Sequence, residues 1–448
     1  MNTPLKQDAD ADYLLIGGGL QNALILLALA ARKPDASITL LEREDALGGN
    51  HIWSFQALDL PESAKLWASA LFEYTWPGYQ IHFDHSSRWV QGSYRSCSSE
   101  HLDRVVRGVA DARANIRLRM GTPVVRCDAN SATLKNGEVL RGRIVVDARG
   151  PEQCAQSRGG GFQKFVGLEC RLRQPTLMTA PLLMDTRCPQ KDGFRFYYVL
   201  PFTEDRVLIE DTYFSNDPGI DVEAISQGIQ RDAHRLGLDI ESVLRTEVGV
   251  LPMPSRSPFS AKPEGPIHAG YAGGWFNPGT GYSLAAAARL AEHLSRTPID
   301  DTFGAAWKRL VRQMRIQSHF LAFLNLLMFG FFHGAKRQRL MERFYLVSDP
   351  VIHRFFAMQN TAADMWRITV PSVRLGPPRA GLNARSLRRG LARGLVDFAF
   401  RPCTERVRKA LVAVLLGLAS IPQAPRFSSN AHGGYEVPAC CNSGVTSG

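Results

Sequence analysis

The chain has 448 residues, too many for one ordinary hydrophobic core, and its apolar content of 45% is that of a globular protein, so two or three subdomains are expected. The formal net charge of +11 is unevenly spread, because from Arg374 to the end eleven basic residues stand against three acidic ones. A nearly neutral body with a basic tail argues against nucleic-acid binding and favours an anionic membrane surface as partner.

The cysteines and the apolar runs limit the compartment and the membrane topology. None of the eight cysteines forms a C-x-x-C pair or a zinc-like spacing, so we interpret them as reduced thiols of a cytoplasmic protein and expect no metal site. The first residues lack the pattern of a signal peptide. The apolar runs at 320–332 and 410–419 are shorter than the ~20 residues that span a bilayer. The first run is either a helix lying on the membrane surface or a buried core helix.

In chain order, the first recognisable unit is a strand, a glycine turn, a helix and a second strand. An apolar strand at 13–16 leads into three glycines, a helix extends to about residue 31, and a strand at 38–41 follows. The glycines allow a tight turn and a close approach of a pyrophosphate to the N-terminus of the helix. An acid after the second strand is placed to accept hydrogen bonds from ribose hydroxyls. The residues predicted to contact a dinucleotide here are Gly17, Gly18, Gly19, Leu20 and Glu42.

Two features qualify this prediction. The third glycine of the usual motif is replaced by Asn22, and the alternative is a glycine-rich turn in a plain α/β domain. Three later segments nevertheless indicate a long cofactor such as FAD: the glycine pair at 48–49, a strand at 144–146, and a glycine-rich stretch at 270–281 before a helix. Their predicted cofactor contacts are Gly49, Asp147, Gly150, Asn277, Thr280 and Gly281.

The spread of these segments resembles FAD proteins of the glutathione-reductase type. On that pattern the last helix would place its N-terminus at the pyrimidine end of the flavin, where it could stabilise a reduced, anionic flavin. Many such flavoproteins carry Gly-Asp before this loop, whereas this chain has Gly270-Tyr271.

A carboxylate pair, Glu210-Asp211, interrupts an otherwise apolar strand, which pairs with the aromatic strand before it. Side chains alternate along a strand, so the two carboxylates are expected on opposite faces, with Glu210 on a partly apolar one. Burial raises the pKa of a carboxyl group, and a neutral acid in a dry pocket can protonate an alkene. The alternative is a structural salt bridge with Arg195 or Arg206.

Aromatic side chains next to this acid allow two interpretations. Phe194, Phe196, Tyr197 and Tyr198 could present π-faces to a cationic intermediate, or could simply fill the core. His51 could titrate near neutrality, or serve as a hydrogen-bonded structural residue beside the cofactor.

The elements together predict an α/β fold. We expect a Rossmann-like FAD-binding domain of glutathione-reductase type with an inserted β-sheet substrate domain and a helical C-terminal region. The predicted boundaries are 1–160 and 266–300 for the FAD-binding domain, 161–265 for the β-rich substrate domain, 301–374 for a helical membrane-associated region, and 375–448 for a basic, partly disordered tail.

Ordered sequence blocks between Ala11 and Arg374 resemble the bacterial lycopene β-cyclases. These blocks are LLIGGGLQNALI, GGNHIWSF, GFQKFVGLECRL, PLLMDTRCPQKDGFRFYYVLP, VLIEDTYF, EVGVLPMP and NPGTGYSLAAA. Where the family usually has His-Pro-Thr-Thr-Gly-Tyr-Ser, this chain begins with Asn277 and has glycine in place of the first threonine, and its tail after about Arg379 matches nothing in the family.

The resemblance implies an enzyme that binds FAD, needs it reduced by NAD(P)H, and converts the acyclic ends of lycopene to β-rings by way of γ-carotene, with no net redox change. The acidic-motif glutamate of the family maps to Glu210, with Asp211 beside it. It further implies a cytoplasmic protein peripherally associated with the membrane, working beside other carotenoid-pathway enzymes. The alternatives are a redox flavoenzyme of similar fold, such as a hydroxylase or an isoprenoid reductase, and a non-catalytic carotenoid or flavin carrier.

Overall fold

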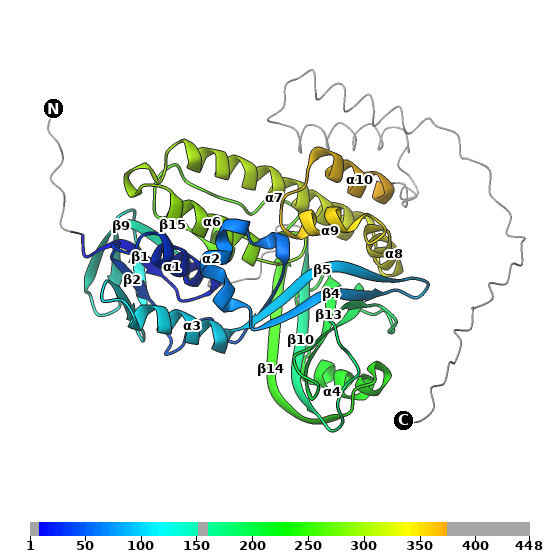
Figure 1. Cartoon of the computed structure of the whole chain (residues 1–448). Helices are drawn as coiled ribbons and strands as arrows, with labels where there is room; N and C mark the ends of the chain where they lie inside the picture. The colour runs from blue at the N-terminus through cyan, green and yellow to red at the C-terminus, as the bar shows by residue number, and fades with distance from the viewer. Residues whose placement is uncertain (1–8, 151–159, 374–448) are drawn as a thin grey trace, which may run out of the picture. The chain divides into compact units, whose positions relative to one another are not determined.

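Two β-sheets and a group of C-terminal helices make up the chain in a computed structural model that describes residues 9–150 and 160–373 (Figure 1). The predicted tail at 375–448, with the apolar run at 410–419, lies outside the described residues.

The first sheet contains the strands predicted for the dinucleotide unit. Its members are β1 (Ala11–Ile16), β2 (Ile38–Leu41), β6 (Ile116–Arg119), β7 (Val124–Cys127), β8 (Ser131–Leu134), β9 (Val139–Asp147) and β15 (Ile267–His268). Their order is β6-β2-β1-β9-β8-β7, with β15 beside β9, and β6, β2, β1, β9 and β15 run parallel. The central strands are buried on both faces, which explains their continuous apolar sequences.

Helices cover this sheet. They are α1 (Leu20–Arg32), the short α2 (Lys65–Ala68), α3 (Ser99–Asp111), the short α5 (Gly270–Gly273) and α6 (Leu284–Arg296). Nearly every residue of α1 is buried, and both α3 and α6 pack against it. A helix that is apolar all round is expected in such an enclosed position. The predicted strand–turn–helix–strand unit is therefore confirmed.

The second sheet is mostly antiparallel. Its strands are β3 (Ile52–Gln56), β4 (Tyr74–His82), β5 (Ser87–Ser98), β10 (Gly161–Leu172), β11 (Leu182–Asp185), β12 (Phe194–Pro201), β13 (Arg206–Ser215) and β14 (Ile240–Met253). The order is β14-β10-β13-β12-β11-β4-β5-β3, and β11 with β4 is its parallel pair. The predicted pairing of the aromatic strand with the acidic strand is the β12–β13 pair.

The β-rich substrate domain was predicted to begin at residue 161, but the second sheet begins earlier in the chain. Strands β3, β4 and β5 come from within 1–160 and join it through the pairing of β4 with β11. The alternation within a strand shows which face is buried but not which distant strand lies beside it, so the sequence could not reveal this junction. The predicted substrate sheet is thus assembled from two separate parts of the chain.

One face of the second sheet is closed by α4 (Val222–Asp232), which begins at the capping side chain of Asp221. Leu168, Val199 and Ile209 pack there against Ile229 of this helix. The opposite face borders the cavity described below.

The C-terminal helices are α7 (Ala305–Phe331), α8 (Ala335–Phe344), α9 (Asp349–Phe356) and α10 (Ala362–Val373), as predicted for this region (Figure 1). The apolar run at 320–332 is mostly a core helix: Phe320, Leu321 and Phe323 are buried, and the Asn325 amide donates to the Pro278 carbonyl at 2.6 Å. Within residues 9–150 and 160–373, the structure has no helix long and apolar enough to cross a bilayer.

Candidate functional site

A cavity of about 1280 Å³ connects the glycine turn of the first sheet with the face of the second sheet that lies opposite α4. Gly17, Gly19 and Glu42 line one part, and Phe196 and Glu210 line another. Side chains from α7, α8, α9 and α10 also contribute to the wall. One continuous space therefore joins the predicted dinucleotide site to the predicted acid.

The glycine turn requires its glycines for two different reasons. Gly17 has a φ of +94°, and a Cβ there would lie 2.8 Å from the Ala148 carbonyl oxygen. Gly19 precedes α1 without a side-chain cap, and a Cβ there would meet nothing within 4 Å. The free N–H groups of this helix start therefore border open space, as an anion site requires.

Gly18 and Leu20 differ in their positions. Leu20 lines the cavity, whereas Gly18 does not. Gly18 packs on Leu47, and its N–H donates to the Glu42 carboxylate. Glu42 also accepts the N–H of Glu44 at 2.9 Å. The backbone thus holds this carboxylate at the cavity wall, where it was predicted to meet a ribose.

Asn22, which replaces the expected third glycine, stabilises the turn. Its amide donates to the carbonyl oxygens of Ile16 and Gly17, both at 2.9 Å. The Asn22 side chain is fully buried between the helix and the strand. A glycine at this position allows close packing because it has no side chain, whereas Asn22 holds the helix against the strand by hydrogen bonds.

The later predicted contacts mostly reach the same cavity. Gly49, Asp147, Gly150, Thr280 and Gly281 all line it. Asp147 is held by Arg149, whose Nε lies 2.9 Å from the carboxylate, and this pairing keeps the pKa of Asp147 below its usual value although burial opposes it.

Asn277 is an exception, since its side chain turns away from the cavity. Its amide donates to the carbonyl oxygens of Phe355 at 2.9 Å and Phe356 at 3.2 Å. The residue therefore ties the glycine loop to α9 instead of facing a cofactor, which corrects the prediction made from the loop alone.

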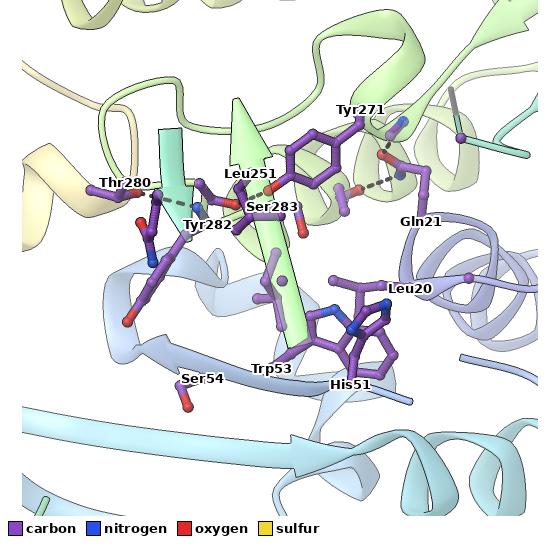
Figure 2. A pocket seen from close by; sticks show the side chains of 18 of the residues that line it. Leu20, Gln21, His51, Trp53, Ser54, Leu251, Tyr271, Thr280, Tyr282 and Ser283 are labelled. Atoms are coloured by element: carbon purple, nitrogen blue, oxygen red, sulfur yellow. Dashed lines mark hydrogen bonds between the residues drawn. The ribbon is translucent and has the colours of Figure 1, made fainter. Parts of the chain in front are cut away.

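Two lining residues were missed in the sequence. The Tyr271 hydroxyl donates to the Gly281 carbonyl (Figure 2). The Tyr271 ring stacks on Phe276 at 4.2 Å between centroids. The Gln21 amide donates to the Ala287 carbonyl at 3.2 Å and accepts the N–H of Gly270. Tyr271, found where many flavoproteins carry Asp, thus supports the loop rather than binding as an acid would.

Glu210 faces the cavity from β13, as the alternation predicted. Within the described part of the chain its carboxyl group has no hydrogen bond or ion pair. Burial raises its pKa well above the usual value, and the nearby Glu247 raises it further. Its surroundings therefore favour the protonated form, which is able to give a proton away.

The register of the sheet places Glu210 in a row across four strands. Gly167 of β10 lies between Glu210 of β13 and Glu247 of β14, and Tyr198 of β12 continues the row. A Cβ on Gly167 would lie 3.0 Å from Cγ of Glu210. The missing side chain therefore leaves the space over β10 into which Glu210 extends.

Asp211 has no access to this cavity. It lies on the opposite face of β13, where both oxygens accept hydrogen bonds from Arg195 at 2.8 Å and one accepts the Tyr213 hydroxyl at 2.9 Å. Its side chain is 1% exposed. The prediction of a catalytic role for Asp211 is not supported by this placement, and the salt-bridge alternative describes it correctly.

The aromatic segment divides in the same way. Phe196 and Tyr198 line the cavity, whereas Tyr197 lies on the α4 side and donates to Asp232 at 2.7 Å. Tyr198 donates to Ser54 at 2.7 Å, and Tyr94 joins it at 3.1 Å.

Tyr94 also bonds the hydroxyl of Tyr282, 3.0 Å away, and Figure 2 shows Tyr282 pointing towards the strand that carries Ser54. These hydroxyls satisfy one another, which leaves aromatic rings at the cavity wall.

His51 lies beside the cavity and contacts the carboxylate row, that is, Glu210 and Glu247 on either side of Gly167. Its Nδ1 is 3.1 Å from Oε1 of Glu247, and its ring lies 5.9 Å from that of Trp53. Figure 2 shows His51 and Trp53 together next to Leu20, at the start of α1. His51 therefore connects the glycine turn with the carboxylate row, close to the structural role that the sequence analysis had considered.

Comparison with known proteins gives consistent matches. Residues 12–385 match the family model described as lycopene cyclase protein. The chain is 34% identical to the lycopene beta-cyclase of Pantoea ananas over 361 residues, 80% of this chain and 93% of that protein. It is also 34% identical to that of Pseudescherichia vulneris over 383 residues, 83% and 97% of the two chains.

Among solved structures, a flavoprotein/dehydrogenase from Cytophaga hutchinsonii has a similar fold. The TM-score is 0.58 at 11% sequence identity, and the match covers 81% of this chain and all of that chain (100%). The α/β architecture expected from the sequence is thereby confirmed.

Proposed function

Because the chain belongs to the lycopene cyclase protein family, we propose that it is a lycopene β-cyclase, which closes the acyclic ends of lycopene into β-rings by way of γ-carotene. The observation that carries the proposal is the Glu210 carboxyl group at the wall of a large cavity, where it has no partner among the described residues and where burial raises its pKa well above the usual value. Leu183, Met184 and Leu327 are among the apolar residues that line this space, which suits a hydrocarbon.

The chemistry begins with Glu210 as acid. The carboxyl group gives its proton to C2 of the terminal C1=C2 alkene, which leaves a tertiary cation at C1. The electrons of the C5=C6 alkene form the C1–C6 bond, so the positive charge moves to C5. Loss of the C6 proton forms the new C5=C6 double bond of the β-ring. One proton enters and one leaves, so no electron acceptor or donor is consumed.

The residues at the glycine turn fit FAD as the cofactor. The start of α1 and the open space at Gly19 suit a pyrophosphate, and Glu42 suits a ribose. When bound in its reduced form, with NAD(P)H as reductant, the flavin supplies negative charge near the developing cation. Tyr198 and Phe196 contribute ring faces to the same wall, which favours a cation over a neutral species.

A peripheral contact with the membrane completes the proposal, since the substrate is a long hydrocarbon. Leu326 and Phe331, near the end of α7, are 39% and 48% exposed, and Leu346, after α8, is 73% exposed. Exposed basic side chains on α8, Lys336 and Arg339, suit an anionic lipid surface.

The deciding experiment is an anaerobic incubation with lycopene in liposomes, FAD and excess NADPH in deuterated buffer. We expect cyclised product that carries solvent deuterium, with no NADPH consumed per turnover. Glu210→Gln should abolish the product while FAD stays bound, and Glu204→Gln, at an exposed position before the same strand, should not. Stoichiometric NADPH loss, or a product changed by two hydrogens or an oxygen, would identify a redox flavoenzyme instead.

A further inference from the structure

A second carboxylate of the cavity has no role in the steps above. Glu247 of β14 lines the cavity and is 4% exposed. Oε1 contacts His51, whereas Oε2 is buried without any hydrogen-bond partner. An unpaired buried oxygen costs free energy, so its retention calls for an explanation.

The two carboxyl groups of the row have different surroundings. Glu210 has no polar partner, which favours its protonated form. Glu247 has the His51 ring beside it, with Nδ1 3.1 Å from Oε1. Two neighbouring carboxyl groups with such different surroundings can serve one as acid and the other as base.

We propose that Glu247 is the general base of the ring closure, the group that accepts the C6 proton. This inference rests on the proposed function. Glu210 loses its proton to C2, and the C6–H bond breaks as the Glu247 carboxylate takes that proton, with the electrons of the C6–H bond forming the C5=C6 double bond. Each ring thus moves one proton from Glu210 to Glu247.

The same row of residues also provides a path by which the proton returns from Glu247 to Glu210. Gly167 separates the two residues without a side chain, so a proton can pass from Glu247 back to Glu210 over β10. The His51 side chain is 55% exposed and offers exchange with solvent. His51 is a positioning residue, because it touches Glu247 and not the reacting carbons.

The position of the base also determines which ring forms. The cation at C5 can lose a proton from C6, from C4 or from its methyl group, and each loss puts the double bond in a different place. A fixed carboxylate at C6 selects the β-ring. Without it, the cation either reverts to the acyclic alkene or loses another proton.

The test compares Glu247→Gln with Glu241→Gln, the same chemical change at an exposed position of the same strand. Both are assayed with reduced FAD and lycopene in liposomes in deuterated buffer. For Glu247→Gln we expect a loss of β-ring formation of about 100-fold, while recovered lycopene gains deuterium because protonation by Glu210 continues and reverses. Any residual rings should carry a displaced double bond. Glu241→Gln and the unchanged chain should behave alike.

Three results would overturn the inference: β-ring formation by Glu247→Gln within threefold of the unchanged chain, loss of deuterium uptake together with ring formation, or full recovery of β-rings at lower pH. The last would mean that Glu247 only keeps Glu210 protonated. Glu247→Asp, which keeps a carboxylate, should retain β-rings as its main product. If the unchanged chain forms no ring at all, the proposed function fails instead.

Discussion

Glu210 and Glu247 lie on either side of one glycine, Gly167, which pairs with both of them across neighbouring strands. Burial and the neighbouring Glu247 carboxylate both disfavour a charge on Glu210 and raise its pKa well above the usual value, so the pair holds a proton more strongly than an isolated glutamate would. The arrangement therefore makes a proton donor of an ordinary glutamate side chain.

The raised pKa of Glu210 predicts a pH dependence of activity. The acid works only when protonated, so turnover should persist above the usual glutamate pKa of 4.5 and fall as pH rises through the raised value. In Glu247→Gln the nearby negative charge is gone, so the uptake of deuterium into lycopene should fall at lower pH than in the unchanged chain. Initial rates between pH 5 and 9 measure both. If the rates of the two proteins fell over the same alkaline pH range, the electrostatic effect of Glu247 on Glu210 would be contradicted.

The same shift predicts a pH dependence of stability. Folded Glu210 keeps a proton that the unfolded chain releases, so its contribution to stability is fully present below pH 4.5 and is lost as pH rises towards the raised pKa. Glu210→Gln is neutral at every pH. Its urea midpoint should therefore exceed that of the unchanged chain more at pH 8 than at pH 5. An equal difference at both pH values would show that Glu210 is not protonated in the folded state.

Asp211 should matter for stability and not for chemistry. Asp211→Asn leaves the Arg195 guanidinium buried without its carboxylate, at a cost of about 3–5 kcal/mol in unfolding free energy. The exposed pair of Arg171 and Asp205 is the matched control, and Asp205→Asn should cost less than about 1 kcal/mol. Urea unfolding compares the two. A turnover loss in fully folded Asp211→Asn as large as that of Glu210→Gln would restore a catalytic role to Asp211.

Gly167→Ala should damage catalysis more than stability. The added Cβ would lie 3.0 Å from Cγ of Glu210, so the acid must shift, and misplacement by about 1 Å can cost 100-fold in rate. Gly108→Ala, on α3 with open space around it, is the control and should leave activity unchanged. Turnover and thermal melting of both variants provide the comparison. Full activity in Gly167→Ala would exclude the close approach of Glu210 to β10.

Glu42 should govern the binding of FAD. Glu42→Ala removes an acceptor for the ribose hydroxyls and the support of the Gly18 and Glu44 N–H groups, so FAD should bind at least ~10-fold more weakly. Glu44→Ala, at the neighbouring exposed position, is the control. Titration of the apoprotein with FAD measures both. Unchanged affinity in Glu42→Ala would place the ribose elsewhere in the cavity.

Local patterns in the sequence predicted local structure well. The strand–turn–helix–strand unit around Gly17 follows from glycines and apolar residues within thirty positions, and the opposite faces of Glu210 and Asp211 follow from alternation alone. The α/β fold could be inferred because such units recur in a small set of architectures.

Features that depend on distant pairing could not be inferred. Glu247 begins the block EVGVLPMP, but nothing in that block shows which residue it meets, and its place beside Glu210 depends on the register of β10 with two strands. The cofactor contact predicted for Asn277 failed for a similar reason, since its partner Phe355 is set by tertiary packing. The sequence identifies a polar residue, but only packing decides whether it faces a ligand or a neighbour.

The chain passes between the two sheets after β2, after β5, after β9 and after β14. A pair of domains joined once can open and close about that single connection, whereas several interwoven connections resist such hinge motion. The spacing between the glycine turn and the carboxylate row is thereby set by covalent connectivity.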